Sequence, residues 1–325
     1  MGSHKRFKIF QRAAARYGMY SFAWLFERLP YAAVRLITGV LIAIGLRCAI
    51  RQRRIAAESV EIAFGDEKSE EEKRQIIKRC FVNFGCGMTE MLYCLAHPDT
   101  AEQRVAFEGK VHLDRAYAQG RGVIAVTAHF GNFPLMMLAC ARQGYKTSAI
   151  IRPARDEELS EYLHKKRTKA GLKTIYATPR MACVSGSLKE LREGGLVFIP
   201  IDQNFGGDGG VYVDFFGHKA ATATGPAVFA LRTGAPILPM FIIRLDNGTH
   251  KIIINPPMTV QQKGSEKETI ATVMTEITAI IEQYIRRYPY EWAWMHRRWK
   301  SRPDGRSFVA GDREGTSREE AIDGA

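Results

Sequence analysis

The sequence predicts an α/β fold in which a mixed, largely parallel sheet is flanked by helices. The first observation is that short apolar runs alternate with helical stretches from Val105 onward, a pattern typical of parallel strands joined by helices. The second is that residues 251–255 read as an antiparallel neighbour of the last apolar run, which makes the sheet mixed. The third is size: 325 residues, 46% of them hydrophobic and 25% charged, are enough for one large domain or two small ones.

The N-terminal segment is basic and apolar, and we expect it to be a membrane anchor, residues 1–54. It holds eleven of the Lys and Arg residues and one acid, Glu27, so it carries +10 of the net charge of +13. Such a local basic face beside apolar sequence favours an anionic membrane surface, and a nucleic-acid groove is the weaker alternative.

The form of that anchor stays open between three alternatives. The uncharged centre of the apolar stretch, residues 36–46, is shorter than the roughly 20 residues of an ordinary spanning helix. A short span would need Arg35 and Arg47 to extend to the two interfaces. A helix lying in the interface, which we favour, would use the aromatic anchors Phe22, Trp24 and Phe26. The third alternative is an ordinary buried helix.

Three regions follow along the chain: a helical lead-in at residues 55–104, the remainder of an α/β domain that extends over 55–303, and a polar tail at 304–325 that we expect to be disordered. Expected strands are residues 122–127, 147–151, 174–176, 195–200 and 237–243, and expected helices begin at 225 and cover 269–287. The six cysteines form no C-x-x-C pair, so we expect reduced core thiols and no metal site.

The first candidate functional residue is His129, which directly follows the expected strand 122–127. Functional sites in open α/β sheets lie at the carboxyl ends of strands. Gly131 permits an unusual backbone shape, and Asn132 can cap the next helix, whose free N–H groups would steady an oxyanion. A histidine in this position can act as a general base, although a merely structural histidine is an equal alternative.

Three further segments carry candidate binding residues. Arg152 directly follows the strand 147–151 and could bind a phosphate or carboxylate, or simply form a surface ion pair. Asp202 and Gln203 end the strand 195–200 on the same edge as His129, and a glycine-rich loop that we expect to be mobile follows. Beyond it, Phe215, Phe216 and Gly217 could line an apolar slot, and Thr222 or Thr224 could cap the helix at Pro226.

The last segment is the aromatic and basic stretch 292–300, WAWMHRRWK. Its aromatic rings and cations suit either RNA or a lipid headgroup layer. Because the N-terminus is also basic and apolar, we expect the lipid layer.

These motifs together resemble the bacterial lipid A biosynthesis acyltransferase family, the lauroyl- and myristoyltransferase group of the glycerolipid acyltransferases. The resemblance rests on AHFGN, IRP, DQN, VDFFGHKAATATGPA, TGAPILP and WMHRRWKSRP in this order, and it covers roughly residues 51–303. It implies an α/β domain on a membrane anchor at the cytoplasmic face of the bacterial inner membrane. It further implies that an acyl thioester, on acyl carrier protein or coenzyme A, donates its chain to a lipid hydroxyl without a metal or organic cofactor.

The same resemblance implies that His129 takes the hydroxyl proton and that Arg152 grips a phosphate. One departure stands out. In the family motif, four residues separate the histidine from an acid, which would place the acid at position 134, but this sequence has Pro134 there. Another carboxylate, Asp202, Glu90 or Asp214, would have to orient His129. Otherwise His129 works alone and more slowly, or the chain is a silent lipid-binding protein. An acceptor of another kind, such as a lysophospholipid or another glycolipid, also stays open.

Overall fold

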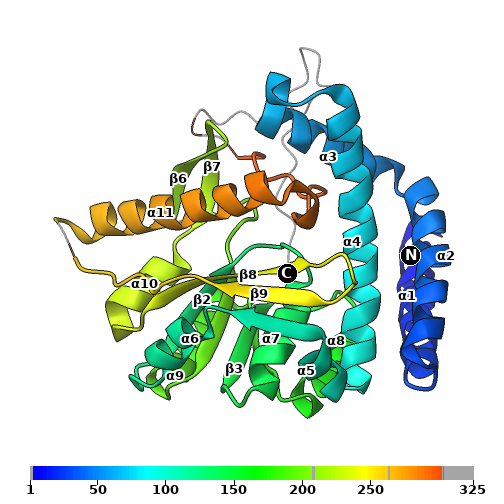
Figure 1. The fold of residues 1–325 in the computed structure, drawn as a ribbon, viewed down its shortest axis with the longest axis horizontal. Helices are drawn as coiled ribbons and strands as arrows, with labels where there is room; N and C mark the ends of the chain where they lie inside the picture. Colours follow the sequence, from blue (N-terminus) through cyan, green and yellow to red (C-terminus); the bar gives the residue numbers. More distant parts are fainter. Residues whose placement is uncertain (1–2, 207–208, 263, 302, 304–325) are drawn as a thin grey trace.

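The computed structural model describes residues 3–206, 209–262, 264–301 and 303 (Figure 1). It contains a seven-stranded sheet with the order β1-β9-β8-β2-β5-β3-β4. Only the β8–β9 pair is antiparallel among the pairs of this sheet, and β1–β9, β8–β2, β2–β5, β5–β3 and β3–β4 are parallel. The predicted α/β class with a mixed, largely parallel sheet is therefore confirmed. The strands are β1 (Val105–Glu108), β2 (Val123–Thr127), β3 (Thr147–Ile151), β4 (Lys173–Tyr176), β5 (Leu196–Pro200), β6 (Gly210–Phe215), β7 (His218–Ala223), β8 (Ile237–Arg244) and β9 (His250–Ile254).

Helices cover both faces of the sheet, and the alternation of side chains along each strand explains why. On β2, Ile124 and Val126 belong to a core shared with α9, α10 and α11, whereas Val123 and Ala125 belong to a core shared with α5, α6 and α7. Every residue of β2 is buried, as expected for a central parallel strand covered on two sides. The helices are α1 (Ser3–Phe26), α2 (Tyr31–Cys48), α3 (Ile50–Phe64), α4 (Glu70–Ala96), α5 (Asp99–Arg104), α6 (Lys110–Tyr117), α7 (Phe133–Arg142), α8 (Glu157–Lys169), α9 (Arg180–Arg192), α10 (Gly225–Thr233) and α11 (Glu266–Arg287), with 3-10 turns at Gly65–Glu67 and Pro289–Glu291.

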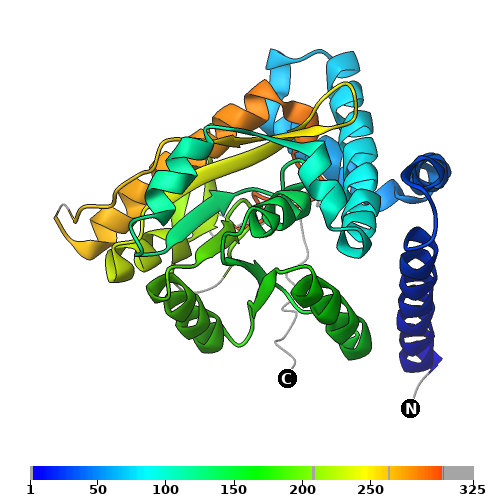
Figure 2. The ribbon, with the colours of Figure 1, turned by 60° about the horizontal axis from the view of Figure 1, so that its bottom comes forward.

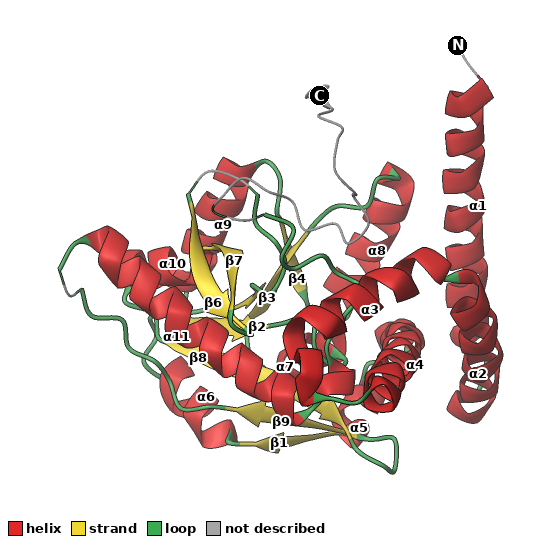
Figure 3. Ribbon diagram, turned by 90° about the horizontal axis from the view of Figure 1, so that it is seen from above, coloured by secondary structure: helices red, strands yellow, loops and turns green. Residues whose placement is uncertain are grey.

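The N-terminal helices α1 and α2 stand at one side of the molecule, next to the long helix α4 (Figure 2, Figure 3). Helix α4 begins in a capping box, in which Ser69 and Glu72 bond each other's backbone N–H groups. The predicted boundary at residue 54 falls inside α3. The predicted tail at 304–325 lies outside the described residues.

Helix α2 is apolar and largely uncovered. It is 18 residues long with a mean hydropathy of 1.6, long and apolar enough by composition to cross a membrane. Within it only Val34 and Thr38 are buried. The alternative of an ordinary buried helix is therefore not what the structure shows. One predicted aromatic anchor is wrong: Phe26 is buried against Val34 and Tyr93, while Phe22 is half-buried and Trp24 is exposed.

Two other expectations need correction. The mobile loop was expected at the glycine pairs of residues 206–210, of which Gly207 and Asp208 lie outside the described residues. The segment that follows, to which no element was assigned, forms the antiparallel hairpin β6–β7. The hairpin turns at Phe216 and Gly217, both with positive φ (51° and 72°), which suits a tight two-residue hairpin turn. Cys48 is exposed rather than in the core.

The aromatic stretch 292–300 does not face a lipid layer. Trp292, Trp294 and Trp299 are buried, and Arg298 is buried with them. Arg298 donates to the carbonyl of Ala221, so this cation closes the C-terminal segment over the hairpin. The pattern was ambiguous because alternating aromatic and basic residues suit an interior segment as well as a surface one.

Candidate active site

The candidate site lies at the carboxyl ends of three adjacent parallel strands. β2, β5 and β3 are neighbours in the sheet, and their ends lead to His129, to Asp202 and Gln203, and to Arg152 respectively. Neighbouring parallel strands end at the same edge, so these four side chains come from segments up to 74 residues apart in sequence and share one edge of the sheet.

The backbone around His129 is held by the segment that follows α11. Phe130 and Trp292 form an antiparallel bridge, Ala293 N donates to His129 O at 3.0 Å, and Gly131 N donates to Glu291 O at 2.8 Å. Gly131 has φ +56°, and a Cβ atom there would stand 2.0 Å from the carbonyl oxygen of Ile242. Only glycine fits this turn. The N–H of Gly131 is already bonded, so it cannot serve the oxyanion as the sequence suggested.

A buried carboxylate holds His129 from two directions. Asp202 Oδ1 lies 2.8 Å from His129 Nδ1, and Asp202 Oδ2 accepts the backbone N–H of His129 at 3.0 Å. The same Oδ2 accepts the indole N–H of Trp292 at 2.7 Å. Asp202 has 1% of its side chain exposed, while the His129 imidazole keeps 23%. Of the three acids proposed to replace the one missing at position 134, Asp202 is the acid that contacts His129.

The electrostatics of the pair follow from this geometry. Burial alone would lower the pKa of His129, but the charge and hydrogen bond of Asp202 outweigh it and raise that pKa above the ordinary value. Burial alone would raise the pKa of Asp202, but the charge of His129 and the hydrogen bonds from His129 and Trp292 lower it to about 2. Asp202 is therefore ionised at neutral pH and can accept a hydrogen bond from Nδ1–H of His129.

The other ring nitrogen of His129 faces polar groups. With the Nδ1 proton donated to Asp202, Nε2 carries a lone pair, and the Gln203 amide nitrogen lies 3.1 Å from it. The same amide nitrogen lies 3.4 Å from Nε2 of His296, whose pKa is lowered by burial and then by the charge of His129. Phe133 packs edge-on against the imidazole with ring centroids 5.0 Å apart. The Gln203 amide nitrogen therefore lies within hydrogen-bond distance of both the His129 and the His296 imidazoles.

Arg152, Asn132 and Glu90, which were also expected at the site, do not contact His129 in the way that Asp202 and Gln203 do. Arg152 is exposed at the end of β3. Asn132 caps α7 through Leu135 N (3.3 Å) and is itself held by Glu90, which accepts from its amide at 3.1 Å. Glu90 also receives two bonds of 2.7 Å from Arg244, so it does not contact His129.

The hairpin residues lie elsewhere. Asp214 is exposed and pairs with Lys219 at 3.0 Å, so it is not brought to His129. Phe215 and Phe216 are buried in an aromatic cluster with Phe64, Trp292, Trp294 and Trp299. Thr224 stands at the N-cap of α10 but makes no capping bond; its hydroxyl donates to Gly209 O at 2.9 Å. Thr222 is buried in β7, and Gly217 forms the hairpin turn.

Sequence reasoning missed three residues that shape the site. Trp292 supports Asp202, His296 flanks the Gln203 amide, and Glu291 binds the Gly131 turn. All three lie in the stretch just after α11. The sequence analysis noted the aromatic and basic residues of this stretch but expected them at a lipid layer, because their partners lie 90 or more residues away.

Comparison with known proteins gives the chain a family context. The family model described as bacterial lipid A biosynthesis acyltransferase matches residues 1–301. The lipid A biosynthesis lauroyltransferase of Escherichia coli (strain K12) is 29% identical over 87% of this chain and 90% of that protein. The lipid A biosynthesis palmitoleoyltransferase of the same organism is 28% identical over 88% of this chain and 91% of that protein. A lipid A biosynthesis acyltransferase of Haemophilus influenzae is 26% identical over 87% of both chains.

Proposed function

Because this chain belongs to the bacterial lipid A biosynthesis acyltransferase family and is an acyltransferase, we propose that it moves a fatty acyl chain from an acyl thioester to a hydroxyl of a lipid A precursor or a related lipid. His129 is the general base in this proposal. The donor is an acyl group on acyl carrier protein or on coenzyme A, and no metal or organic cofactor takes part. The reaction takes place at the cytoplasmic face of the bacterial inner membrane.

The observation that carries the proposal is the contact between His129 and Asp202. An ionised carboxylate 2.8 Å from Nδ1 fixes the tautomer in which Nε2 is the basic nitrogen, and it stabilises the imidazolium that forms during proton transfer. A silent lipid-binding protein has no need of such a buried charged pair, so this contact favours catalysis over a purely structural role.

The steps follow from the geometry. Nε2 of His129 takes the proton of the acceptor hydroxyl, whose oxygen attacks the thioester carbonyl carbon. The oxyanion of the tetrahedral intermediate needs a donor, and the Gln203 amide, 3.1 Å from Nε2, is the side chain placed to supply it once substrate displaces it from the imidazole. The C–S bond then breaks, and the leaving thiolate is protonated by the imidazolium of His129. The products are an ester and a free thiol. Arg152, exposed at the same edge, is the candidate clamp for a phosphate.

The experiment uses the purified chain in mild detergent with a labelled acyl chain on acyl carrier protein or coenzyme A and a panel of acceptors: lipid A precursor, lysophospholipid and other glycolipids. We expect transfer to the lipid A precursor and a loss of at least about 10³-fold in His129→Ala, because the base is removed. His112→Ala on α6 is the matched control and should retain activity. Transfer that is indifferent to His129→Ala, or absent with every acceptor, would overturn the proposal.

A further inference from the structure

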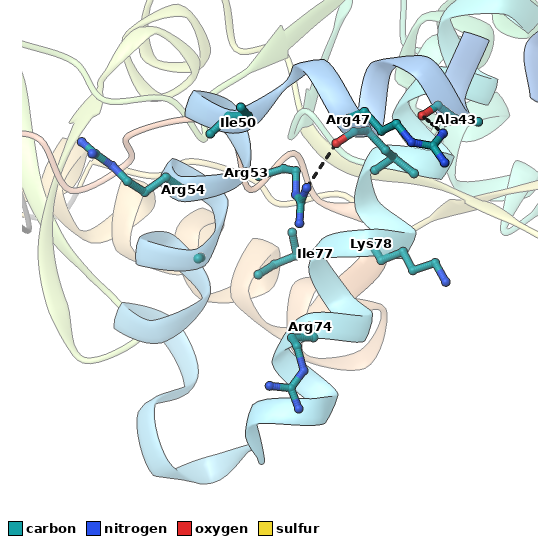
Figure 4. Close-up of a pocket in the computed structure, with 10 residues that line it drawn as sticks. Ala43, Arg47, Ile50, Arg53, Arg54, Arg74, Ile77 and Lys78 are labelled. Atoms are coloured by element: carbon teal, nitrogen blue, oxygen red, sulfur yellow. Dashed lines mark hydrogen bonds between the residues drawn. The ribbon is translucent and has the colours of Figure 1, made fainter. Parts of the chain in front are cut away.

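A groove lies where α2, α3 and α4 meet, away from the edge of the sheet. It encloses about 850 Å³. The residues that line it are Ala43, Leu46, Arg47, Ile50, Arg53, Arg54, Ala57, Arg74, Ile77 and Lys78 (Figure 4). Five of them are cations, and none of them is acidic, so the groove is suited to an anion.

Three of the five cations form no salt bridge with an acid among the described residues, although Lys78 still attracts the exposed carboxylate of Glu71. Arg54 pairs with Glu58, and Arg74 pairs with Glu71. Arg47 and Arg53 instead donate to helix carbonyls, to Ala43 O at 3.3 Å and to Leu46 O at 3.2 Å, and both keep further N–H donors.

Lys78 is the third. It is exposed on α4 and has no ion pair within the described part of the chain. Figure 4 shows Arg53 reaching toward Ile77 in the space between α3 and α4, while Arg54 extends away from the group. Arg47, Arg53 and Lys78 all line this groove, and guanidinium and ammonium groups are the side chains that bind phosphate in proteins.

The remaining lining is apolar. Leu46, Ile50 and Ile77 form it, and Ile50 is 73% exposed. Exposed apolar surface flanked by cations is unfavourable against water but suits a lipid, whose headgroup is charged and whose chains are hydrocarbon.

The apolar lining continues toward His129 through shared residues. Leu46 also lines a second groove between α2 and α4, together with Leu41, Ile42 and Phe84. Phe84 in turn lines a small cavity that contains His129 and Phe133. Between Leu41 and Leu46 the helix advances about 7 Å at 1.5 Å per residue. A hydrocarbon chain laid along α2 from the cations would therefore lead toward the catalytic edge.

We propose that this groove seats the phosphate-bearing end of the acceptor lipid, with Arg47, Arg53 and Lys78 on the phosphate and hydrocarbon along Leu46 toward Phe84. This inference rests on the proposed function, because the groove is assigned to the acceptor of that reaction. An acidic protein partner would use the cations but would leave the apolar lining without a purpose, which is why a lipid is the better fit.

The test measures equilibrium binding of a lipid A precursor in neutral detergent micelles, without acyl donor, before and after phosphatase treatment of the lipid. The variant Arg47→Gln/Arg53→Gln/Lys78→Gln is compared with Arg115→Gln/Arg192→Gln/Lys267→Gln, a control that removes the same charge from exposed cations on α6, α9 and α11. We expect the groove variant to bind the phosphorylated lipid about tenfold more weakly and the dephosphorylated lipid like wild type. The control should match wild type with both lipids.

Lys78→Glu provides a second variant, because Arg47 and Arg53 also support the α2–α3 junction and their replacement could disturb it. Lys78→Glu should weaken binding of the phosphorylated lipid at an unchanged melting temperature. In turnover, the groove variant should raise KM for the acceptor and leave kcat within about twofold.

Four results would overturn the inference: unchanged affinity for the phosphorylated lipid, equal losses for both lipids, a loss confined to vesicles of phosphatidylglycerol, or a rise confined to KM for acyl carrier protein. The third would indicate a general membrane-surface contact and the fourth a protein-docking site. Absence of transfer in the wild type would defeat the proposed function alone, because the binding measurement contains no donor.

Discussion

The residue that distinguishes this site is Asp202, whose carboxylate contacts both Nδ1 and the backbone N–H of His129. Pro134 is the second residue of α7 and has no carboxylate. Asp202 reaches the same imidazole from the end of β5, because β5 is hydrogen-bonded to β2 in parallel and the two strands end together. A carboxylate can therefore serve the histidine across the sheet edge as well as from one helical turn away.

The variant Asp202→Asn should show how much activity depends on the Asp202 carboxylate that orients the His129 imidazole, because the imidazole itself is retained. The variant keeps the size of the side chain but removes the charge that raises the pKa of His129, leaving burial, which lowers it. We expect kcat to fall on the order of 10³- to 10⁴-fold. The acid limb of kcat/KM, which reports deprotonation of His129 and should lie above pH 6.5 in wild type, should move to lower pH.

The pH profile of kcat/KM is the measurement, since a merely structural effect would lower the rate without moving the limb. Asp214→Asn removes an exposed acid of the hairpin and is the control. An acid limb that stays in place in Asp202→Asn would contradict the role given to this carboxylate.

Sequence alone could nominate Asp202 but not rank it above Glu90 and Asp214. All three lie in segments with site-like composition. The choice depends on strand order, which places β5 beside β2, and on a half-buried Arg244 that binds Glu90. Both facts are contacts between distant segments, and no local pattern encodes them.

At the scale of elements, the short segment after α11 does more than close the chain. Its residues 291–293 pair with residues 129–131, so a piece of backbone beyond α11 fixes the turn that carries His129. Glu291 is the charged member of this segment. It is buried, and its Oε1 accepts the backbone N–H of Arg244 at 3.2 Å.

The buried carboxyl of Glu291 predicts that the free energy of unfolding depends on pH. Burial raises its pKa from 4.5 to about 7. The folded state therefore holds this proton more tightly than the unfolded state. The stability that it contributes is complete below pH 4.5 and is lost as pH rises through about 7.

Glu291→Gln removes the titration but keeps an oxygen for the Arg244 N–H. The free energy of unfolding of the variant, relative to wild type, should therefore rise between pH 5 and pH 8, by up to about 3 kcal/mol. Urea unfolding in mild detergent at the two pH values measures it, with Glu276→Gln, an exposed acid of α11, as the control. A difference independent of pH would mean that Glu291 is ionised in the folded state throughout this range.

The elements that the sequence predicted well are those with a strong local pattern. The strands of residues 122–127, 147–151 and 195–200 and the helix 269–287 match β2, β3, β5 and α11 to within a few residues. The hairpin β6–β7 was missed because its turn uses Phe216 at positive φ, a conformation rare outside glycine. The four-residue edge strand β1 was not predicted.

At the scale of the whole molecule, the sheet edge at His129 and the exposed apolar helix α2 are connected through α4. Helix α2 packs on α4, and Phe84 of α4 lies beside the cavity at His129. The opposite side of α2 carries Leu36, Val40 and Ile44, which are 76%, 61% and 54% exposed. Residues four apart share one face of a helix, so these side chains form an apolar stripe directed away from the domain.

This stripe predicts how the chain holds to a membrane. Each such side chain transferred from water to an apolar environment contributes about 1.5–3 kcal/mol when fully buried. Leu36→Ser with Val40→Ser should therefore weaken partition into phospholipid vesicles by at least about tenfold. The fold should be retained, because neither side chain packs in the core.

Flotation with vesicles measures the partition, and Val111→Ser with Met181→Ser is the matched control, since these two apolar side chains are also exposed but lie on the α/β domain. Unchanged flotation of the α2 variant would show that this helix is not the membrane contact, and the basic N-terminal residues alone would then have to supply it. Loss of flotation with full activity on a detergent-soluble acceptor would separate anchoring from catalysis. That separation is expected because the stripe and the groove leading to His129 occupy different sides of the same helix.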